Sequence, residues 1–443
     1  MSIFVRLTSS LFFSLVTFSV CAAPAVRDAV SKDYEDYLKP LFVHFHQNPE
    51  LSMGEVNTAA RLAKEFSSLG FDVHEGIGET GVVAIFKNGD GPTVMMRGDM
   101  DGLPVKEDSG LSYMSEAEQL DPISKEVRPV MHACGHDVHI TGLVGTARYM
   151  ASHLDQWSGT LMLIAQPAEE RIMGARKMIE DGLWEKFDKP DFALALHVFA
   201  EVEMGKIDVR SGPISAGSTS VDIIVHGEGT HGAYPQGGID PVVLGSQIVM
   251  ALQTLVSREI GPKEPAVVTV GAFNSGFKHN VISDRAHLKI TTRYTSPKTK
   301  QTILEGIKRI AENMGRVAGM PEDKLPEVIV SKDEDTPPQI NDGELTQRLT
   351  LRWQQQYGEQ YVVSVPDEGM GAEDFPFFVT GFDIPSVYWS VGGASSEDIQ
   401  AQEKGEYKIP SHHSPFFKVE PESVAYAVDS TVTALLDLMG RLQ

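Results

Sequence analysis

The chain has 443 residues, of which 42% are hydrophobic and 22% charged, an ordinary globular mixture with material for roughly two to three domains. Aspartate and glutamate total 61 against 38 lysines and arginines, so the formal net charge is −23. Such an acidic surface repels nucleic-acid phosphates and anionic lipid head groups. We therefore expect neither nucleic acid nor a membrane surface as a partner.

The first residues have the pattern of a targeting segment. Arg6 precedes an apolar run at residues 11–20, and small residues suited to cleavage end at Ala22. The run is too short to span a bilayer as a helix, and no later stretch predicts a membrane anchor. We predict a cleaved signal peptide at residues 1–22, with lipoprotein processing at Cys21 as the weaker alternative. The mature protein is then expected in the periplasm or outside the cell.

Cleavage would leave Cys134 as the only cysteine, since the chain has two in all. A single cysteine cannot form an internal disulfide. In an oxidising compartment we expect such a thiol to be buried, catalytic or metal-bound.

In chain order, the first half alternates short β-branched runs with longer amphipathic segments. Predicted strands cover residues 82–86, 93–97, 160–166 and 192–198, and predicted helices cover residues 56–69 and 140–154. This alternation predicts an α/β domain whose sheet is largely covered by helices.

A second pattern begins near Gly217. It contains predicted strands at residues 221–226, 267–272 and 286–294 and predicted helices at residues 240–259 and 298–317. The order predicts a small α+β domain with helices on one face of an antiparallel sheet. We therefore assign residues 216–327 to an inserted domain, and residues 23–215 with 328–443 to a main domain. A charged, proline-containing segment at residues 331–342 is the expected return hinge, and residues 423–442 are the expected last helix.

Cys134 and His136 lie two residues apart in the segment His132-Ala133-Cys134-Gly135-His136-Asp137. Gly135 permits a tight turn, and the segment leads into a predicted helix. A helix N-terminus favours the thiolate form of cysteine, which is the form that binds metal. A Cys-x-His pair alone is a weak signal of a metal site.

Glu169 and Glu170 directly follow the predicted strand at residues 160–166. Open α/β sheets bind their ligands beyond the carboxyl ends of the strands. Of two adjacent carboxylates, one can ligate a metal while the other accepts a proton from water. An isolated pair of this kind is more often a solvated loop.

Histidines complete the set of candidate donors. His197 lies at the end of a predicted strand, where a single histidine is more often a core residue than a ligand. His412 and His413 precede Pro415 near the C-terminus. Thiol, imidazole and carboxylate donors together suit Zn, Mn, Co or Ni, and their number suits two ions.

Further motifs follow one another along the chain. They are His46-Gln47-Asn48-Pro49-Glu50-Leu51, Arg97-Gly98-Asp99-Met100-Asp101-Gly102-Leu103-Pro104, Pro167-Ala168-Glu169-Glu170, Gly229-Thr230-His231-Gly232-Ala233, Met370-Gly371-Ala372-Glu373-Asp374-Phe375 and His413-Ser414-Pro415. With these motifs the sequence resembles the M20 metallopeptidases, specifically their amidohydrolase branch, over nearly all of the mature chain. The resemblance implies a mixed-sheet α/β catalytic domain with an inserted α+β lid or dimerisation domain.

The resemblance also implies a role for each matching residue. The metal ligands would be Cys134, His136, Glu170, His197 and His413. Glu169 would be the general base, and Asp99 and Asp101 would support the ligands without binding metal.

Other implied roles fall on the inserted domain. His231 would reach the active site of the partner subunit in a homodimer and polarise the scissile carbonyl. Asn280 and Arg293 would contact the free carboxylate of the substrate.

Three positions leave alternatives open. Gln236 stands where the family often has a histidine near the substrate, so the preferred acyl group is undetermined. His412 precedes His413 where many members carry an apolar residue, so one of the pair could be mistaken for the other. His139, about one helical turn after His136, is a spare donor that we assign to packing or to support of the ligands.

The implied activity is hydrolysis of the amide bond of N-acyl or N-aroyl amino acids with two divalent ions per subunit. Cleavage of dipeptides or of the C-terminal residue of short peptides is the alternative within the family. A thiol hydrolase with Cys134 as nucleophile and His132 or His136 as base is a rival, but it leaves Glu169 and His413 without roles. A non-catalytic metal-dependent binding protein is a second rival, against which an intact Glu169 argues.

Overall fold

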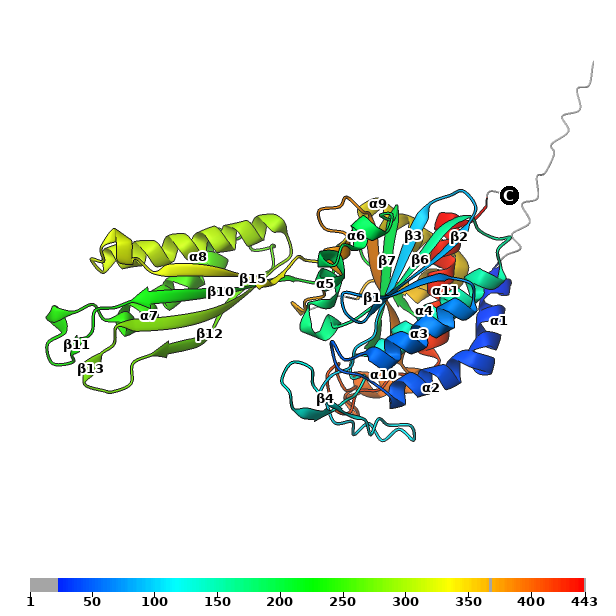
Figure 1. Ribbon diagram of the computed structural model, residues 1–443, viewed down its shortest axis with the longest axis horizontal. Coiled ribbons are helices and arrows are strands. Elements are labelled where there is room, and N and C mark those ends of the chain that lie inside the picture. The colour runs from blue at the N-terminus through cyan, green and yellow to red at the C-terminus, as the bar shows by residue number, and fades with distance from the viewer. Residues whose placement is uncertain (1–22, 366–368, 442–443) are drawn as a thin grey trace, which may run out of the picture.

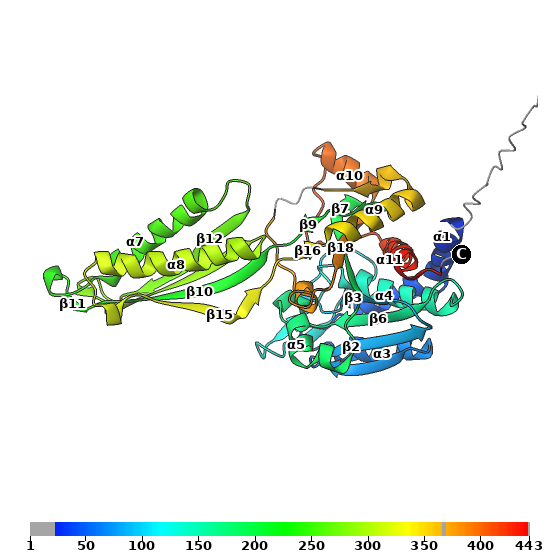
Figure 2. The same cartoon turned by 90° about the horizontal axis from the view of Figure 1, so that it is seen from above.

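The computed structural model describes residues 23–365 and 369–441, so the predicted signal peptide lies outside the described residues. The described chain forms a main domain and an elongated inserted unit that projects from it (Figure 1). The view from above shows the same separation of the two parts (Figure 2). None of the described helices is both long and apolar enough to cross a membrane.

The main domain is built on a mixed sheet of 8 strands in the order β1-β2-β6-β3-β7-β18-β8-β17. The strands are Asp72–Ile77 (β1), Gly81–Asn88 (β2), Gly159–Gln166 (β6), Thr93–Asp99 (β3), Phe192–Glu203 (β7), Ser386–Ala394 (β18), Ile207–Asp208 (β8) and Val362–Val363 (β17). The central strands β6, β3, β7 and β18 run parallel, and β2 and β1 extend one edge in antiparallel orientation. The predicted α/β class is confirmed.

Both faces of this sheet are covered, which explains why its strands are apolar without alternation. In β6, Leu161 and Leu163 face one core, and Met162 and Ile164 face another. The first core is covered by Ala23–Asp33 (α1), Lys39–Gln47 (α2), Val56–Ser68 (α3), His136–Ser152 (α4), Gly343–Tyr357 (α9) and Ser423–Met439 (α11), and the second by Gly174–Glu180 (α5), Leu183–Lys186 (α6) and the short 3₁₀ helix Phe375–Phe378.

Helix α4 is buried along almost its whole length. It packs so closely on α11 that a Cβ atom added to Gly145 would lie 2.5 Å from a side-chain atom of Val428. The helix begins at His136, before the predicted start at residue 140. Its first turn is polar and buried, so no amphipathic pattern marks that start in the sequence.

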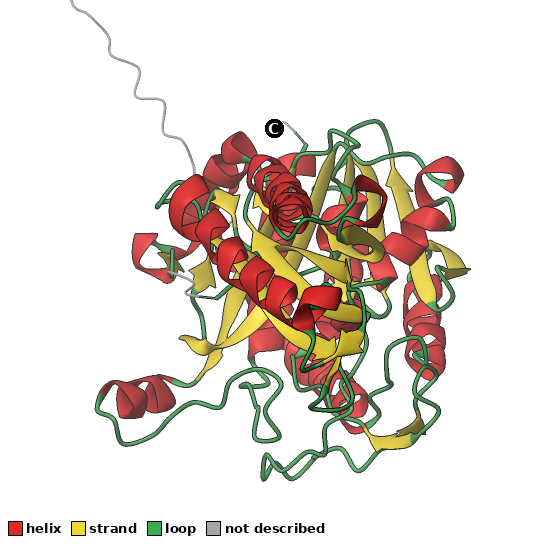
Figure 3. Cartoon of the chain, turned by 90° about the vertical axis from the view of Figure 1, so that its left-hand side faces the viewer, coloured by secondary structure: helices red, strands yellow, loops and turns green. Residues whose placement is uncertain are grey.

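The inserted unit has the predicted order of elements around a four-stranded antiparallel sheet, β12-β14-β10-β15. The strands are Ala266–Ser275 (β12), Arg285–Tyr294 (β14), Gly217–His226 (β10) and Glu327–Thr336 (β15), and the helices are Pro241–Thr254 (α7) and Pro297–Val317 (α8). Asp240 and Ser296 cap the two helices by accepting hydrogen bonds from backbone N–H groups of the first turns. A separate apolar core lies between helices and sheet. Figure 3 views the molecule from the side of this unit.

The return to the main domain comes later than residue 327, which corrects the predicted boundary and the predicted hinge at residues 331–342. Strand β15 pairs with β10 from Glu327 as far as Thr336 and therefore belongs to the inserted sheet. Most of its side chains are exposed, because β15 is an edge strand. Charged residues are common on edge strands, and they hide the strand pattern in the sequence.

The remaining described elements are short. They include the hairpin of Glu118–Leu120 (β4) and Val127–Pro129 (β5), the pair Gly212–Pro213 (β9) and Ile340–Asn341 (β16), the pair Thr230–His231 (β11) and Val281–Ile282 (β13), and the helix Ser396–Glu403 (α10).

Candidate metal centre

The turn before α4 places Cys134 and His136 next to each other. Gly135 lies between them in the left-handed conformation, with φ 83°. A Cβ atom at this position would lie 2.4 Å from a side-chain atom of Val198 in β7. Only glycine therefore allows the turn to approach the strand that carries the next candidate ligand.

Asp101, which follows β3, orients the loop of the two glutamates after β6. Its Oδ1 accepts a hydrogen bond from Glu169 N and its Oδ2 accepts one from Glu170 N, both at 3.1 Å. Ser52 Oγ donates to Oδ2 at 2.6 Å. Because β3 and β6 are parallel neighbours that end at the same edge, one carboxylate can hold both backbone groups. This is the supporting position that the resemblance implied for Asp101.

Two imidazoles direct their Nε2 atoms toward the candidate site, because a backbone carbonyl holds each Nδ1. His136 Nδ1 lies 2.8 Å from the carbonyl oxygen of Asp101, and His197 Nδ1 lies 2.7 Å from that of Val198. A carbonyl oxygen accepts only, so each Nδ1 carries a proton, and each Nε2 has a free lone pair when the ring is neutral. Burial lowers the pKa of His136, but the carboxylate of Asp99 outweighs it and raises that pKa well above its usual value, so a cation bound here would replace the proton on His136 Nε2. Metal-ligating histidines are typically held in this manner.

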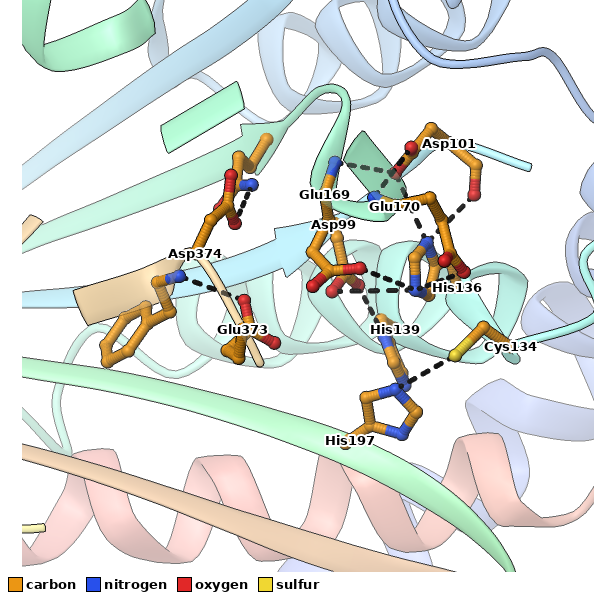
Figure 4. A network of polar contacts seen from close by, with 12 residues as sticks. Asp99, Asp101, Cys134, His136, His139, Glu169, Glu170, His197, Glu373 and Asp374 are labelled. Atoms are coloured by element: carbon orange, nitrogen blue, oxygen red, sulfur yellow. Dashed lines mark hydrogen bonds and ion pairs between the residues drawn. The ribbon is translucent and has the colours of Figure 1, made fainter. Parts of the chain in front are cut away.

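The candidate donors converge around those lone pairs (Figure 4). His136 Nε2 lies 3.8 Å from Glu170 Oε1 and 3.9 Å from Glu169 Oε2. His197 Nε2 lies 3.4 Å from Cys134 Sγ. His413 joins from the C-terminal loop, with Nε2 3.4 Å from Glu170 Oε2. The structure thus brings together all six of the residues predicted as ligands or base.

Unpartnered atoms at this point fit a bound cation. His136 Nε2 and Glu170 Oε1 are buried and have no hydrogen-bond partner. Cys134, His136 and Glu170 each offer a ligand atom within 4.8 Å of the others, and so do Asp99, His136 and Glu169. Buried polar atoms without partners are costly, and a divalent ion would satisfy both of them at once.

Electrostatics lead to the same conclusion. Burial and the carboxylate of Glu170 raise the pKa of the Cys134 thiol well above its usual value. Burial and the carboxylate of Glu373 raise the pKa of Glu169 in the same way, and burial raises the pKa of Glu170 to about 7. Cations among these groups would restore the thiolate and the carboxylates, because they stabilise the charged forms.

His139 lies beside the cluster, but the protein occupies both of its ring nitrogens. Its Nε2 accepts a hydrogen bond from Val198 N at 2.9 Å, so Nδ1 carries the proton and donates to Asp99 Oδ1 at 2.5 Å. No lone pair remains for a metal. His139 therefore supports the centre through Asp99 and β7.

Arg97 is a part of the site to which sequence reasoning gave no role. Its guanidinium is fully buried, pairs with Asp99 and donates to Gln166 Oε1 at 2.7 Å and to Glu373 Oε1 at 2.8 Å. Glu373 in turn offers a carboxylate oxygen within 4.8 Å of Glu169. Arg97 and Glu373 both lie in motifs named above. Their spacing in the sequence does not show that the Arg97 side chain points from β3 into the interior, where it neutralises acids from a distant loop.

His46, in α2, is a second buried charge next to the centre. Its Nδ1 lies 2.7 Å from Asp137 Oδ2 and its Nε2 lies 3.1 Å from Glu107 Oε1. Burial alone lowers the pKa of His46, but the hydrogen bonds to the two carboxylates outweigh it and raise the pKa to about 10. His46 therefore stays protonated at neutral pH and fixes Asp137 in the first turn of α4.

Replacing His46 with Asn is expected to destabilise the protein in a pH-dependent manner. The folded pKa of about 10 exceeds the ordinary value of 6.5, so the stabilisation is complete below pH 6.5 and is lost as the pH rises toward 10. Each pKa unit corresponds to about 1.4 kcal/mol of unfolding free energy. Urea unfolding at pH 6 and pH 10 measures the difference, with exposed His44→Asn on the same helix as control. A loss of stability that is equal at both pH values would contradict the ion pairs.

The predicted residues of the inserted domain lie away from the cluster. His231 is in β11 and Asn280 precedes β13, at the end of the unit farthest from the main domain (Figure 1). They adjoin each other, since Gly232 N donates to Asn280 O at 2.8 Å. Arg293 pairs with Ser218 at the opposite end of the inserted sheet, near the connection to the main domain.

Comparison with known proteins agrees with this fold. The sequence matches peptidase family M20/M25/M40 over residues 95–414, and the chain belongs to that family. It is 36% identical over 334 residues to a hippurate hydrolase from Campylobacter jejuni, covering 75% of this chain and 82% of the relative. It is 34% identical over 399 residues to IAA-amino acid hydrolase ILR1-like 4 from Arabidopsis thaliana, covering 90% and 84%.

A solved structure of a dinuclear metal-binding M20 peptidase from Bacillus subtilis superposes with a TM-score of 0.73 at 25% identity, covering 92% of this chain and 99% of the other. Within the family, the chain falls in the amidohydrolase branch, as the resemblance implied. The protein is a metal-dependent hydrolase that acts on amides.

Proposed function

We propose that the protein hydrolyses the amide bond of N-acyl or N-aroyl amino acids and releases a carboxylic acid and a free amino acid. The observation that carries this proposal is the convergence of a thiol, two imidazole Nε2 atoms and Glu170, with Glu169 facing the same point. Cleavage of dipeptides or short peptides at the same centre is the alternative, in keeping with the name of the family.

Cys134, His136, Glu170, His197 and His413 would hold two divalent ions, whose Lewis acidity would lower the pKa of a water molecule toward neutrality. Glu169 removes the proton of the attacking water and later delivers it to the leaving amine. Its position suits this role, because Asp101 holds its backbone and its Oε2 lies 3.9 Å from His136 Nε2, beside the proposed ions.

We propose that active sites are completed across a homodimer. The distal position of His231 and Asn280 in the inserted unit prevents them from lying at the centre of their own subunit in this conformation. The outer faces of α7 and α8 carry exposed apolar side chains, including Met250 at 71% and Val317 at 77% exposure. Such a patch is typical of a surface that contacts another protein, and a second copy would bring His231 to the opposite centre.

Arg293 would then reach the substrate from a different subunit than His231 and Asn280. Strands β10 and β14 pair along ten residues, with Arg293 near one end of the pairing and His231 and Asn280 beyond the other end. At 3.4 Å per residue, Arg293 is therefore about 30 Å from the other two side chains. One substrate cannot contact all three in a single subunit. We propose that Arg293 binds the carboxylate of a substrate in its own subunit, while His231 and Asn280 come from the partner.

Mixing two inactive variants is expected to restore activity if His231 acts across the dimer. A hybrid of Glu169→Gln and His231→Ala subunits has one site with both Glu169 and the histidine of the other chain. Random exchange of equal amounts makes half of the dimers hybrid, so about one quarter of the wild-type activity should return. Each variant refolded alone is the control. Failure to recover activity in verified hybrids would contradict the shared site.

An aromatic surface next to the centre favours an aryl or other apolar acyl group. The ring of Phe199 is 38% exposed and lies 5.5 Å from the ring of His197, centre to centre. It is two residues from His197 in β7, so both side chains point to the same face of the strand. An aryl group placed there could stack on Phe199 while its amide carbonyl lies at the ions.

The test is a panel of N-acetyl, N-benzoyl and aminobenzoyl amino acids together with dipeptides, with enzyme reconstituted in Zn, Mn, Co and Ni. We expect the aroyl amino acids to have the highest kcat/KM. Phe199→Ala should lower kcat/KM for aroyl substrates by about tenfold, the equivalent of 1–1.5 kcal/mol of stacking, and affect N-acetyl substrates less. Higher turnover of dipeptides than of every acyl amino acid would establish the alternative.

A further inference from the structure

Two adjacent histidines in the C-terminal loop turn to different partners. His413 has a left-handed backbone, with φ 67°, and its N–H donates to Ala133 O at 2.8 Å. This turns its imidazole toward Glu170. His412 turns the other way, with Nδ1 3.6 Å from Cys134 Sγ. The loop therefore offers one imidazole to the carboxylate side of the centre and one to the sulfur side.

The protonation of His412 follows from its other nitrogen. Nε2 accepts a hydrogen bond from the backbone N–H of Ala200 in β7, at 3.3 Å. A nitrogen that accepts from an N–H has a free lone pair, so in the neutral ring the proton is on Nδ1. The atom that faces Cys134 is therefore a donor and not a free ligand atom. His197 differs on this point, because its Nε2 faces the same sulfur with a lone pair.

Packing fixes this orientation. The ring of His412 lies between aromatic neighbours, with centre-to-centre distances of 5.2 Å to His197, 5.1 Å to Phe199 and 4.8 Å to Phe417. A flipped ring would lose both the contact with Ala200 N and the contact with the sulfur. The imidazole is thus held with its N–H directed at Cys134.

We propose that His412 is a positioning residue that donates a hydrogen bond from Nδ1 to the thiolate of Cys134 at the proposed metal centre. The bond stabilises the sulfur lone pairs and reduces the charge that the sulfur donates to a bound ion. That ion then stays a stronger Lewis acid than it would be next to a free thiolate. The role presupposes the metal centre of the proposed function, and it adds a residue that does not itself bind the metal.

Cobalt-substituted protein provides the test, because a cobalt–thiolate bond has a near-ultraviolet charge-transfer band. His412→Leu should bind as much Co²⁺ as wild type at saturation, but its band should move to longer wavelength, since the sulfur lone pairs lie higher in energy without the hydrogen bond. His412→Asn, whose side-chain N–H₂ can take the place of Nδ1–H, should return the band toward the wild-type position. His412→Leu should also lower metal affinity or kcat/KM by about 10- to 100-fold. His44→Leu, an exposed histidine, is the matched control.

Three results would overturn the role of His412. A loss of one equivalent of Co²⁺ from His412→Leu, measured at saturating metal, would make His412 a ligand. An unshifted band in a fully loaded His412→Leu protein would show that no hydrogen bond reaches the sulfur. Absence of the band from the wild-type protein would remove Cys134 from the centre, so that the proposed metal set fails together with this role. Circular dichroism of each variant verifies folding, and the Asn variant retains the test if the Leu variant does not fold.

Discussion

Glu169→Gln is expected to lower kcat by roughly 10²–10⁴-fold while the protein keeps its full metal content. The substitution preserves the size of the side chain and its backbone contacts with Asp101, but an amide cannot accept the proton of the attacking water. KM should change little, because the ions and the substrate contacts remain. Steady-state kinetics together with metal analysis of the same preparation measure both quantities.

The matched control is the same substitution at the next residue. Glu170→Gln removes the negative charge of a proposed ligand, whose oxygens lie 3.8 Å from His136 Nε2 and 3.4 Å from His413 Nε2. We expect this variant to lose metal, so that its activity depends on the metal concentration in the assay. Full activity of Glu169→Gln, or loss of metal from it, would disprove the assignment of the base.

Removal of the divalent ions by a chelator is expected to abolish activity, and Zn, Mn, Co or Ni should restore it. The ions would lower the pKa of the attacking water, and without them Glu169 would have only an ordinary water molecule to deprotonate. Burial also keeps the Cys134 thiol protonated in the metal-free protein, which makes it a poor nucleophile. Activity measured before chelation, after chelation and after reconstitution shows whether the ions are required.

The same experiment distinguishes the rival mechanism. A thiol hydrolase that uses Cys134 would keep its activity after chelation and lose it on alkylation. Metal should also stabilise the fold, by about 2.7 kcal/mol when its free concentration is 100 times its Kd, so Tm should fall on chelation and recover on reconstitution. A chelated protein with unchanged Tm and activity would contradict the metal centre.

Much of the candidate site could be predicted from local sequence. Glu169 and Glu170 follow an apolar strand, and His197 lies in another, so the rule that parallel strands end at one edge places them near each other. The glycine between Cys134 and His136 predicts the turn that brings β7 within reach. Each of these signals is local, and the resemblance to a known family joined them into one predicted site.

Other features depend on contacts between distant segments. Arg97 donates a hydrogen bond to Glu373, which lies 276 residues away in the sequence. The imidazoles of His412 and His413 have different partners because of the left-handed backbone of His413 and the contact of His412 with Ala200 N. Similarly, β15 has no apolar alternation, so only its pairing with β10 shows that it belongs to the inserted sheet. Local pattern carries no information on such pairings.

The sequence by itself determined the α/β class, the inserted unit and the types of donor atom available to a metal, because periodicity and residue chemistry are local properties. Only the tertiary structure decided which lone pairs face the centre, which imidazoles are donors instead, and that Arg293 lies at the opposite end of a sheet from His231. The physical reason is that the protonation state of an imidazole nitrogen depends on what its other nitrogen contacts, and the direction of a side chain depends on what it packs against. Those partners come from remote parts of the chain.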